Sequence, residues 1–253
     1  VAAPEGRAHL WRKVRLAFQF AGAHLLADFD YFLKADVDTF VLMPNLRSFL
    51  LSLGRRPDSA WWTGRLLRLR LGTPQRWRWQ RYMSGGAGYA LSRGAVRNLL
   101  ADRAGKDCGT VTSEDVNMGE PGRHVHCASF CCESSAASRG CAWMLAQLLW
   151  TAGGICMERR GVEFADSFDP GSEGGERFHP MSFASHLDFG AAPTTHWLWQ
   201  YSVRPVRSGL RCCSSSSISF HYVSPQEMRT FHFLLYTLRR GRWPVPCSRL
   251  LCL

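Results

Sequence analysis

The sequence contains no long apolar stretch and no internal repeat, and it has very few lysines. Its longest run without a charged residue, 140–157, is interrupted by glycine and is shorter than the ~20 apolar residues of a membrane-spanning helix. The absence of a repeat or heptad period excludes solenoid, coiled-coil and collagen architectures. Basic residues are arginines except Lys13, Lys34 and Lys106. With 46% hydrophobic and 20% charged residues, the 253-residue chain has the composition of a globular protein.

Positive charge exceeds negative charge, with 31 Lys and Arg against 20 Asp and Glu and a formal net charge of +11. Such a balance favours phosphate-bearing or other anionic partners, but only in general terms. The densest basic stretch, 64–81, interleaves arginine with tryptophan, as some nucleic-acid surfaces do. No RRM, KH or helix-turn-helix pattern surrounds it. We therefore expect a twisted strand and loop with a solvated basic face, and no nucleic-acid partner.

Ten cysteines occur without the paired C-x-x-C spacing of a zinc site. Cysteine at this density predicts disulfide bonds and an oxidising, lumenal or secreted environment. The first residues, VAAPEGRAHLWRK, form neither a signal peptide nor a membrane anchor. We therefore expect the chain to be a fragment of a protein of the secretory pathway.

Helical and strand-type hydrophobic patterns alternate along the chain, which predicts an α/β domain. The apolar run at 31–33 is typical of a buried central strand, and Ser92 is a suitable N-cap. We expect helices over 10–26, 44–53, 93–100 and 226–239, and strands over 31–33, 61–71 and 219–223.

Two aspartates follow the strand predicted at 31–33. On an extended strand, Asp36 and Asp38 would face the same way, and Val37 between them would face the core. Adjacent carboxylates repel each other unless a cation lies between them, and their hard oxygens suit Mg²⁺ or Mn²⁺. Ligands of open α/β sheets bind beyond the carboxyl ends of strands. The pair therefore predicts a divalent-cation site for a diphosphate, with a chance pair in a surface turn as the alternative.

Other motifs each have a functional and a structural interpretation. His221, in the strand-like segment SFHYV, is either a metal ligand or a hydrogen-bonded strand histidine. Glu114 and Asp115 are either functional acids or ordinary acids at a helix N-terminus. The tryptophans of HWLWQY either stack on a ligand or form the core face of a strand. The glycines at 84–88 either permit close approach of a ligand or mark only a turn.

The order of the motifs is more specific than any one of them. KADVDTFV, NLR, YMSGGAGYALS, SEDV, a Cys-Cys pair and SFHYV follow one another along the chain. This series resembles the core 1 β1,3-galactosyltransferase (T-synthase) group of the β1,3-glycosyltransferase superfamily, over 14–119 and 155–238. The resemblance implies an α/β fold of GT-A type (Rossmann-like), with a mixed central sheet flanked by helices. It also implies a type II Golgi membrane protein with a lumenal catalytic domain and an N-terminal anchor that this chain does not contain.

The resemblance implies transfer of galactose from UDP-galactose to O3 of GalNAc on Ser or Thr of glycoproteins, with inversion and with Mn²⁺. Asp36, Asp38 and His221 would hold the metal, and Asp115 would be the general base. These roles suit the chemistry, because single displacement needs one base and a cation that stabilises the UDP leaving group.

The resemblance also assigns the remaining site residues. Lys34, Tyr222, Gly85 and Gly86 would contact the donor. The acceptor would be contacted by Trp199, which would stack on the acceptor sugar, and by Glu114.

Cysteines at matching positions imply disulfide bonds. Cys108 and Cys156 are expected to pair with each other. One of Cys212 and Cys213 is expected to pair with another part of the domain.

The chain departs from the family pattern in three places. Val37 stands where an Asp is usual, 120–154 has no counterpart, and the family's first strand–helix units are missing. We expect one glycosyltransferase domain over 1–253, incomplete at its N-terminus, with 120–154 as a loop or disordered insert. A catalytically inactive relative acting as a lumenal chaperone, a sibling β1,3-glycosyltransferase with another acceptor, and homodimer formation are open alternatives.

Overall fold

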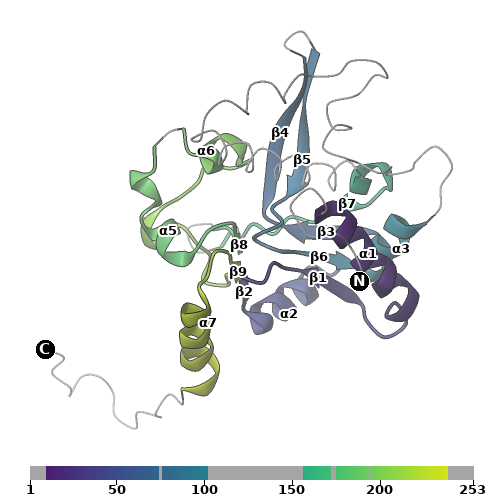
Figure 1. The fold of residues 1–253 in the computed structure, drawn as a ribbon, viewed down its shortest axis with the longest axis horizontal. Coiled ribbons are helices and arrows are strands. Elements are labelled where there is room, and N and C mark those ends of the chain that lie inside the picture. The colour runs from purple at the N-terminus through teal and green to yellow at the C-terminus, as the bar shows by residue number, and fades with distance from the viewer. Residues whose placement is uncertain (1–9, 74–75, 102–155, 172–174, 194, 239–253) are drawn as a thin grey trace, which may run out of the picture. The chain divides into compact units, whose positions relative to one another are not determined.

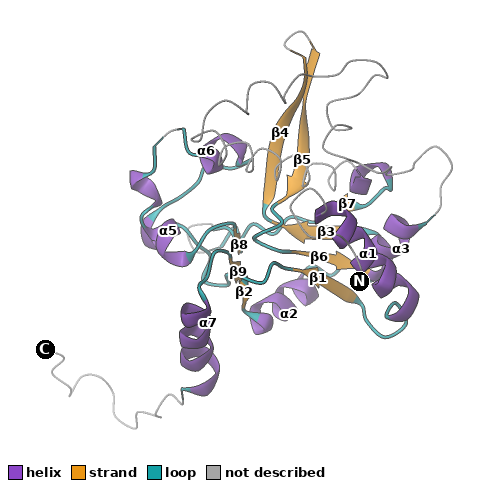
Figure 2. Ribbon diagram, viewed as in Figure 1, coloured by secondary structure: helices purple, strands orange, loops and turns teal. Residues whose placement is uncertain are grey.

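The computed structural model describes residues 10–73, 76–101, 156–171, 175–193 and 195–238. The chain divides into two compact units, Val1–Tyr222 and Val223–Leu253, whose elements are labelled in Figure 1 and distinguished by type in Figure 2. The larger unit contains helices α1 (Leu10–His24), α2 (Met43–Ser52), α3 (Arg93–Leu100), α5 (Phe183–Leu187), η2 (Phe189–Ala191), α6 (Trp197–Tyr201) and η3 (Gly209–Arg211). Its strands are β1 (Tyr31–Lys34), β2 (Phe40–Val41), β3 (Trp61–Gly64), β4 (Leu66–Thr73), β5 (Arg76–Met83), β6 (Tyr89–Ser92), β7 (Glu163–Phe164), β8 (Phe178–His179) and β9 (Ser219–Phe220).

The strands within the described ranges form three sheets. The first has the order β1-β6-β3-β7, in which only β3 and β7 run parallel. The second has the order β2-β9-β8, with β2 and β9 antiparallel and β8 and β9 parallel. The third is the antiparallel hairpin β4-β5. The fold is therefore a mixed α/β arrangement of mixed sheets flanked by helices, as expected.

Helices cover both faces of the first sheet. Consecutive residues of β3 point to opposite faces and therefore pack against different helices. Trp61 lies in a buried cluster with α2, whose members include Leu46, Phe49 and Leu50. Trp62 lies in another cluster, shared with α1 and α3, whose members include Val14, Phe18, Val96 and Leu99. The two-sided burial explains why β3 and β6 are buried along their whole length.

The prediction for the strand at 31–33 was right in position and wrong in environment. β1 pairs with β6 at one end of the described sheet, so it is not central. Leu33 is 37% exposed. The apolar residues of β1 instead line a groove together with residues of α1, which accounts for the apolar run.

The strand predicted over 61–71 is two strands, because the chain leaves the first sheet at Arg65. The guanidinium of Arg65 is buried, and its Nη1 lies 2.6 Å from Oε1 of Glu176. Its Nη2 donates a hydrogen bond of 3.1 Å to the hydroxyl of Ser202. Burial, with a contribution from Arg204, lowers the pKa of Arg65 to about 9, so Arg65 is charged at neutral pH.

The predicted helices at 10–26, 44–53 and 93–100 are confirmed within a few residues as α1, α2 and α3. Ser92 caps α3, since its hydroxyl accepts hydrogen bonds from the backbone N–H of Ala95 and of Trp61. In the smaller unit, α7 (Pro225–His232) starts with a capping box formed by Ser224 and Glu227 and continues as the π-helix η4 (Phe233–Thr237). No helix in the described ranges is both long and apolar enough to cross a membrane.

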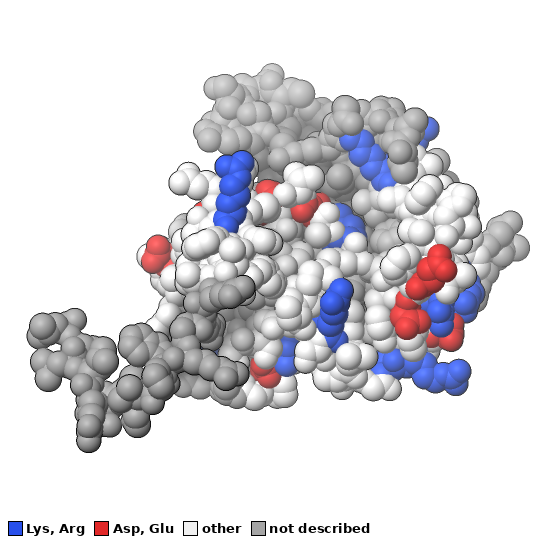
Figure 3. Space-filling model, turned by 90° about the horizontal axis from the view of Figure 1, so that it is seen from below, with Lys and Arg blue, Asp and Glu red and all other residues white. Residues whose placement is uncertain are grey.

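Surface charges are partly paired locally. Arg93 contacts Asp58 and Asp30, and Arg55 contacts Glu163. On the face in Figure 3, basic and acidic groups lie side by side at the right edge. The basic stretch predicted as strand and loop forms the hairpin β4-β5, in which the guanidinium of Arg68 lies 4.6 Å from the ring centroid of Trp79.

Candidate metal centre

The two aspartates lie in a turn between β1 and β2. Neither belongs to a strand, and the backbone N–H of Thr39 closes the turn with a hydrogen bond of 3.1 Å to the carbonyl of Asp36. Val37 is 99% exposed, so the expectation that it faces the core was wrong. The turn, and not strand alternation, gives the two carboxylates a common direction.

His221 reaches the aspartates because β2 pairs with β9. Phe40 lies opposite Phe220 in this antiparallel pair, which places the residue after β9 beside the residues before β2. Nε2 of His221 lies 3.2 Å from Oδ1 of Asp38 and 3.7 Å from Oδ2 of Asp36. The three side chains therefore offer ligand atoms that all lie within 4.8 Å of one another.

The orientation of the imidazole fits a cation at this point. Nδ1 of His221 lies 3.3 Å from the carbonyl oxygen of Pro180, which can only accept a hydrogen bond, so Nδ1 carries a proton. With Nδ1 engaged in this way, Nε2 is the ring nitrogen that faces the two carboxylates and is available to a cation between them. Two carboxylate oxygens and one imidazole nitrogen form a donor set that Mn²⁺ accepts.

Lys34 lies beside this group. Its ammonium contacts Asp36 and donates a hydrogen bond of 3.1 Å to the carbonyl of Gly85. Burial lowers the pKa of Lys34, while Asp36 and Asp38 oppose this shift. The lysine therefore places a basic group directly beside the carboxylate of Asp36.

Tyr222 lies at the rim of the same group. Its ring centroid is 3.8 Å from that of His221, and 58% of the residue is exposed. Its φ of 56° lies in the left-handed region, which costs an L-residue about 1–2 kcal/mol. Strain of this kind is often found at functional sites, and the place of Tyr222 beside the donor stays a prediction.

The glycine loop before β6 packs against the candidate ligands. The carbonyl of Gly86 accepts a hydrogen bond of 2.7 Å from the hydroxyl of Thr39. A Cβ built on Gly86 would lie under 3.0 Å from three ring atoms of His221. Sequence reasoning missed Thr39 and Pro180 as neighbours of this site, although Thr39 directly follows the aspartate pair.

Trp199 belongs to α6, so the alternative that the tryptophans form one face of a strand was wrong. Its ring packs 4.7 Å from that of Phe189 and is 37% exposed. In the part of the chain that the structure describes, it does not join the three candidate ligands. Its role toward an acceptor stays a prediction.

Some predicted residues fall outside the described ranges. These are Glu114, Asp115 and Cys108, together with the unmatched segment 120–154. Cys156 is disulfide-bonded, and its pairing with Cys108 stays a prediction.

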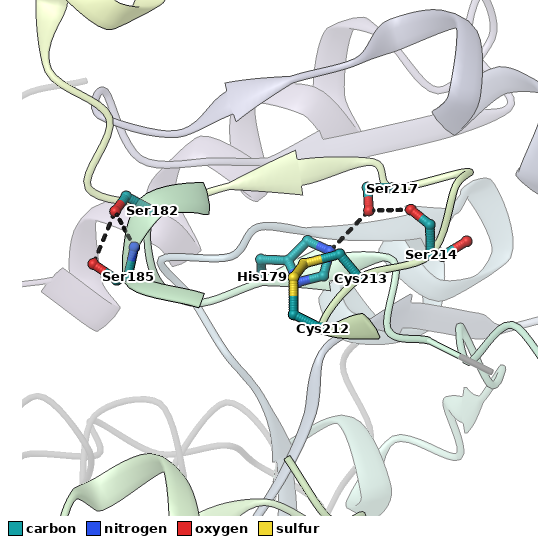
Figure 4. Close-up of a disulfide and its surroundings, with 7 residues drawn as sticks. All are labelled: His179, Ser182, Ser185, Cys212, Cys213, Ser214 and Ser217. Carbon is teal, nitrogen blue, oxygen red and sulfur yellow. Dashed lines mark hydrogen bonds between the residues drawn. A yellow bond between two sulfur atoms is a disulfide. The ribbon is translucent and has the colours of Figure 1, made fainter. Parts of the chain in front are cut away.

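Cys212 and Cys213 form a disulfide with each other, shown in Figure 4. The expectation that one of them pairs with another part of the domain was therefore wrong. The pair lies beside His179, whose Nε2 is 3.0 Å from the hydroxyl of Ser217. Cysteine spacing alone does not determine connectivity, because several pairings satisfy the same count.

The mixed α/β fold and the acidic and histidine ligand group are consistent with a glycosyltransferase domain of GT-A type. No family model matches the chain. Over 237 residues the chain is 33% identical to glycoprotein-N-acetylgalactosamine 3-beta-galactosyltransferase 1 of Xenopus laevis. The aligned region covers 93% of this chain and 53% of the relative. The chain thus spans about half the length of the curated relative that it matches. This similarity confirms the resemblance to the core 1 β1,3-galactosyltransferase group.

Proposed function

We propose that this chain is part of a galactosyltransferase that transfers galactose from UDP-galactose, in β1,3 linkage and with inversion, to GalNAc on Ser or Thr of glycoproteins. The observation that carries the proposal is that Asp36 and Asp38 lie close to the distant His221. The chain in which they do so is similar to such an enzyme. Location of the catalytic domain in the Golgi lumen, as part of a type II membrane protein, belongs to the same proposal, as do glycoprotein acceptors as partners.

Each residue has a physical task in this proposal. Asp36, Asp38 and His221 would hold Mn²⁺, which supplies Lewis-acid stabilisation of the diphosphate leaving group. Lys34 adds a positive charge close to the same phosphates, and Tyr222 borders the nucleotide. Asp115 would accept the proton of the acceptor hydroxyl. The acceptor sugar would stack on Trp199, because an indole face suits the C–H face of a sugar.

The metal assignment is tested by Asp38→Ala, with the exposed Asp28→Ala as the matched control. Transfer of galactose to a GalNAc-peptide is measured in the full-length protein, with and without Mn²⁺, and Mn²⁺ binding is measured on the chain by electron paramagnetic resonance. We expect Asp38→Ala to abolish Mn²⁺-dependent transfer and Asp28→Ala to retain it. Equal turnover with and without the carboxylate of Asp38 would refute the metal site, and a native protein that binds Mn²⁺ without transferring galactose would favour the inactive relative.

The base assignment is tested by Asp115→Asn, which keeps the size of the side chain and removes its basicity. We expect unchanged UDP affinity and transfer slowed by about 10²–10⁴-fold, the usual contribution of general-base catalysis. A loss of UDP affinity instead would place Asp115 in the donor site.

A further inference from the structure

Two glycines of the loop before β6 are required for different reasons. Gly88 has a φ of 77°, which favours glycine for its backbone conformation. Gly86 is not one of the described residues with a positive φ, so its backbone conformation does not require glycine. What Gly86 lacks room for is a side chain, because an ideal Cβ would approach Cε1, Nδ1 and Nε2 of His221 to less than 3.0 Å.

The ring atoms that this Cβ would meet include the ligand atom. Nε2 of His221 would lie 2.8 Å from it, and the same Nε2 lies 3.2 Å from Oδ1 of Asp38. At Nδ1 the ring lies within hydrogen-bond distance of the carbonyl oxygen of Pro180. The side chain of His221 is only 11% exposed and lies between these groups. A methyl group at position 86 therefore requires either the ring or the loop to move.

The loop itself is tied to the aspartate turn. Thr39 closes that turn through its backbone N–H and donates its side-chain hydroxyl to the buried carbonyl of Gly86. On the other side of the loop, the hydroxyl of Ser219 in β9 donates to the carbonyl of Ala87. One short segment thus touches the aspartate turn and the strand that leads to His221.

We propose that Gly86 is a positioning residue for the metal ligand His221, with Thr39 holding its peptide in place, and that it does not act by contacting the donor. The inference rests on the proposed metal site. Because Gly86 has no side chain, the imidazole of His221 has room to face the two carboxylates. Groups that orient a metal ligand without binding the ion commonly change metal affinity by about 10–100-fold when they are removed.

The test measures Mn²⁺ affinity of the chain by electron paramagnetic resonance for Gly86→Ala, His221→Ala and the double variant. We expect Gly86→Ala to weaken Mn²⁺ binding by about 10–100-fold. In the His221→Ala background the same change should have no further effect, because the ring that it displaces is gone. Unchanged affinity in Gly86→Ala, or losses that add in the double variant, would overturn the proposal.

A matched control separates positioning from general damage to the fold. Gly94→Ala in α3 places a Cβ against the backbone of Asp58 and Ser59, away from the three ligands. We expect it to lower the melting temperature without weakening Mn²⁺ binding by the folded protein. Equal loss of Mn²⁺ affinity in Gly94→Ala and Gly86→Ala would contradict a specific role for Gly86.

A second arm applies if Gly86→Ala does not fold. Thr39→Val removes the hydroxyl that holds Gly86 and should weaken Mn²⁺ binding, while Thr39→Ser should restore it. Failure of serine to restore binding would overturn the role of Thr39. If His221→Ala itself leaves Mn²⁺ affinity unchanged, the metal site fails, and that result differs from failure of the positioning role alone.

Discussion

The buried ion pair between Arg65 and Glu176 allows a sharp test of the tertiary structure. Their side chains are only 4% and 12% exposed, and Nη1 of Arg65 lies 2.6 Å from Oε1 of Glu176. Nε of Arg65 is buried without a hydrogen-bond partner in the described part of the chain. The change Glu176→Gln keeps the shape of the side chain and removes its negative charge. Arg65 would then be left as a buried charge without the one carboxylate that pairs with it among the described residues.

The expected cost follows from this burial. Removing one partner of a buried ion pair typically costs about 3–5 kcal/mol, because the remaining charge is uncompensated. For a unit of about 200 residues, each kcal/mol lowers the melting temperature by about 2–4 °C, so Glu176→Gln should lower it by about 6–20 °C. Replacing both partners by apolar residues, as in Arg65→Met with Glu176→Leu, should be much less costly.

Thermal unfolding followed by circular dichroism measures the effect, and an exposed pair is the control. Glu163 pairs with Arg55 at 3.0 Å, but its side chain is 74% exposed. Glu163→Gln should therefore cost at most about 1 kcal/mol. Equal changes in melting temperature for Glu176→Gln and Glu163→Gln would refute the argument that burial makes the first pair important.

Two further predictions concern acid and the disulfide. Burial, reinforced by nearby positive groups, lowers the pKa of His186 to about 3. The imidazole of the unfolded chain titrates near pH 6.5, so between pH 6.5 and 3 the unfolded state binds one proton more than the folded state. As the pH is lowered through this range, the free energy of unfolding falls by up to about 1.4 kcal/mol per pH unit. Denaturant titrations at several pH values should show a shallower acid loss in His186→Gln, and an identical slope would contradict a buried neutral ring. The disulfide between Cys212 and Cys213 closes a loop of consecutive residues, so replacing both by serine should cost only about 1 kcal/mol. A loss of several kcal/mol in the same titration would show that the bridge stabilises more than its own turn.

The aspartate pair shows how a correct site can follow from an incorrect local structure. Side-chain alternation on a strand predicted that Asp36 and Asp38 share a direction and that Val37 faces the core. The carboxylates do converge, but through a turn in which Val37 faces solvent. Residue type and spacing identified the candidate ligands, whereas the backbone conformation between β1 and β2 depended on contacts made by Thr39 and Lys34.

The sequence by itself determined the elements that depend on local interactions. Apolar spacing and the Ser92 cap located α1, α2 and α3, because periodicity and capping act within a few residues. The ordered motifs identified the family resemblance and the candidate ligands.

Only the tertiary structure decided which distant groups meet. The pairing of β2 with β9 brings His221 to Asp36 and Asp38, and the same packing leaves no room for a side chain at Gly86. Strand pairing and close packing join residues far apart in the chain, and no local pattern specifies those contacts.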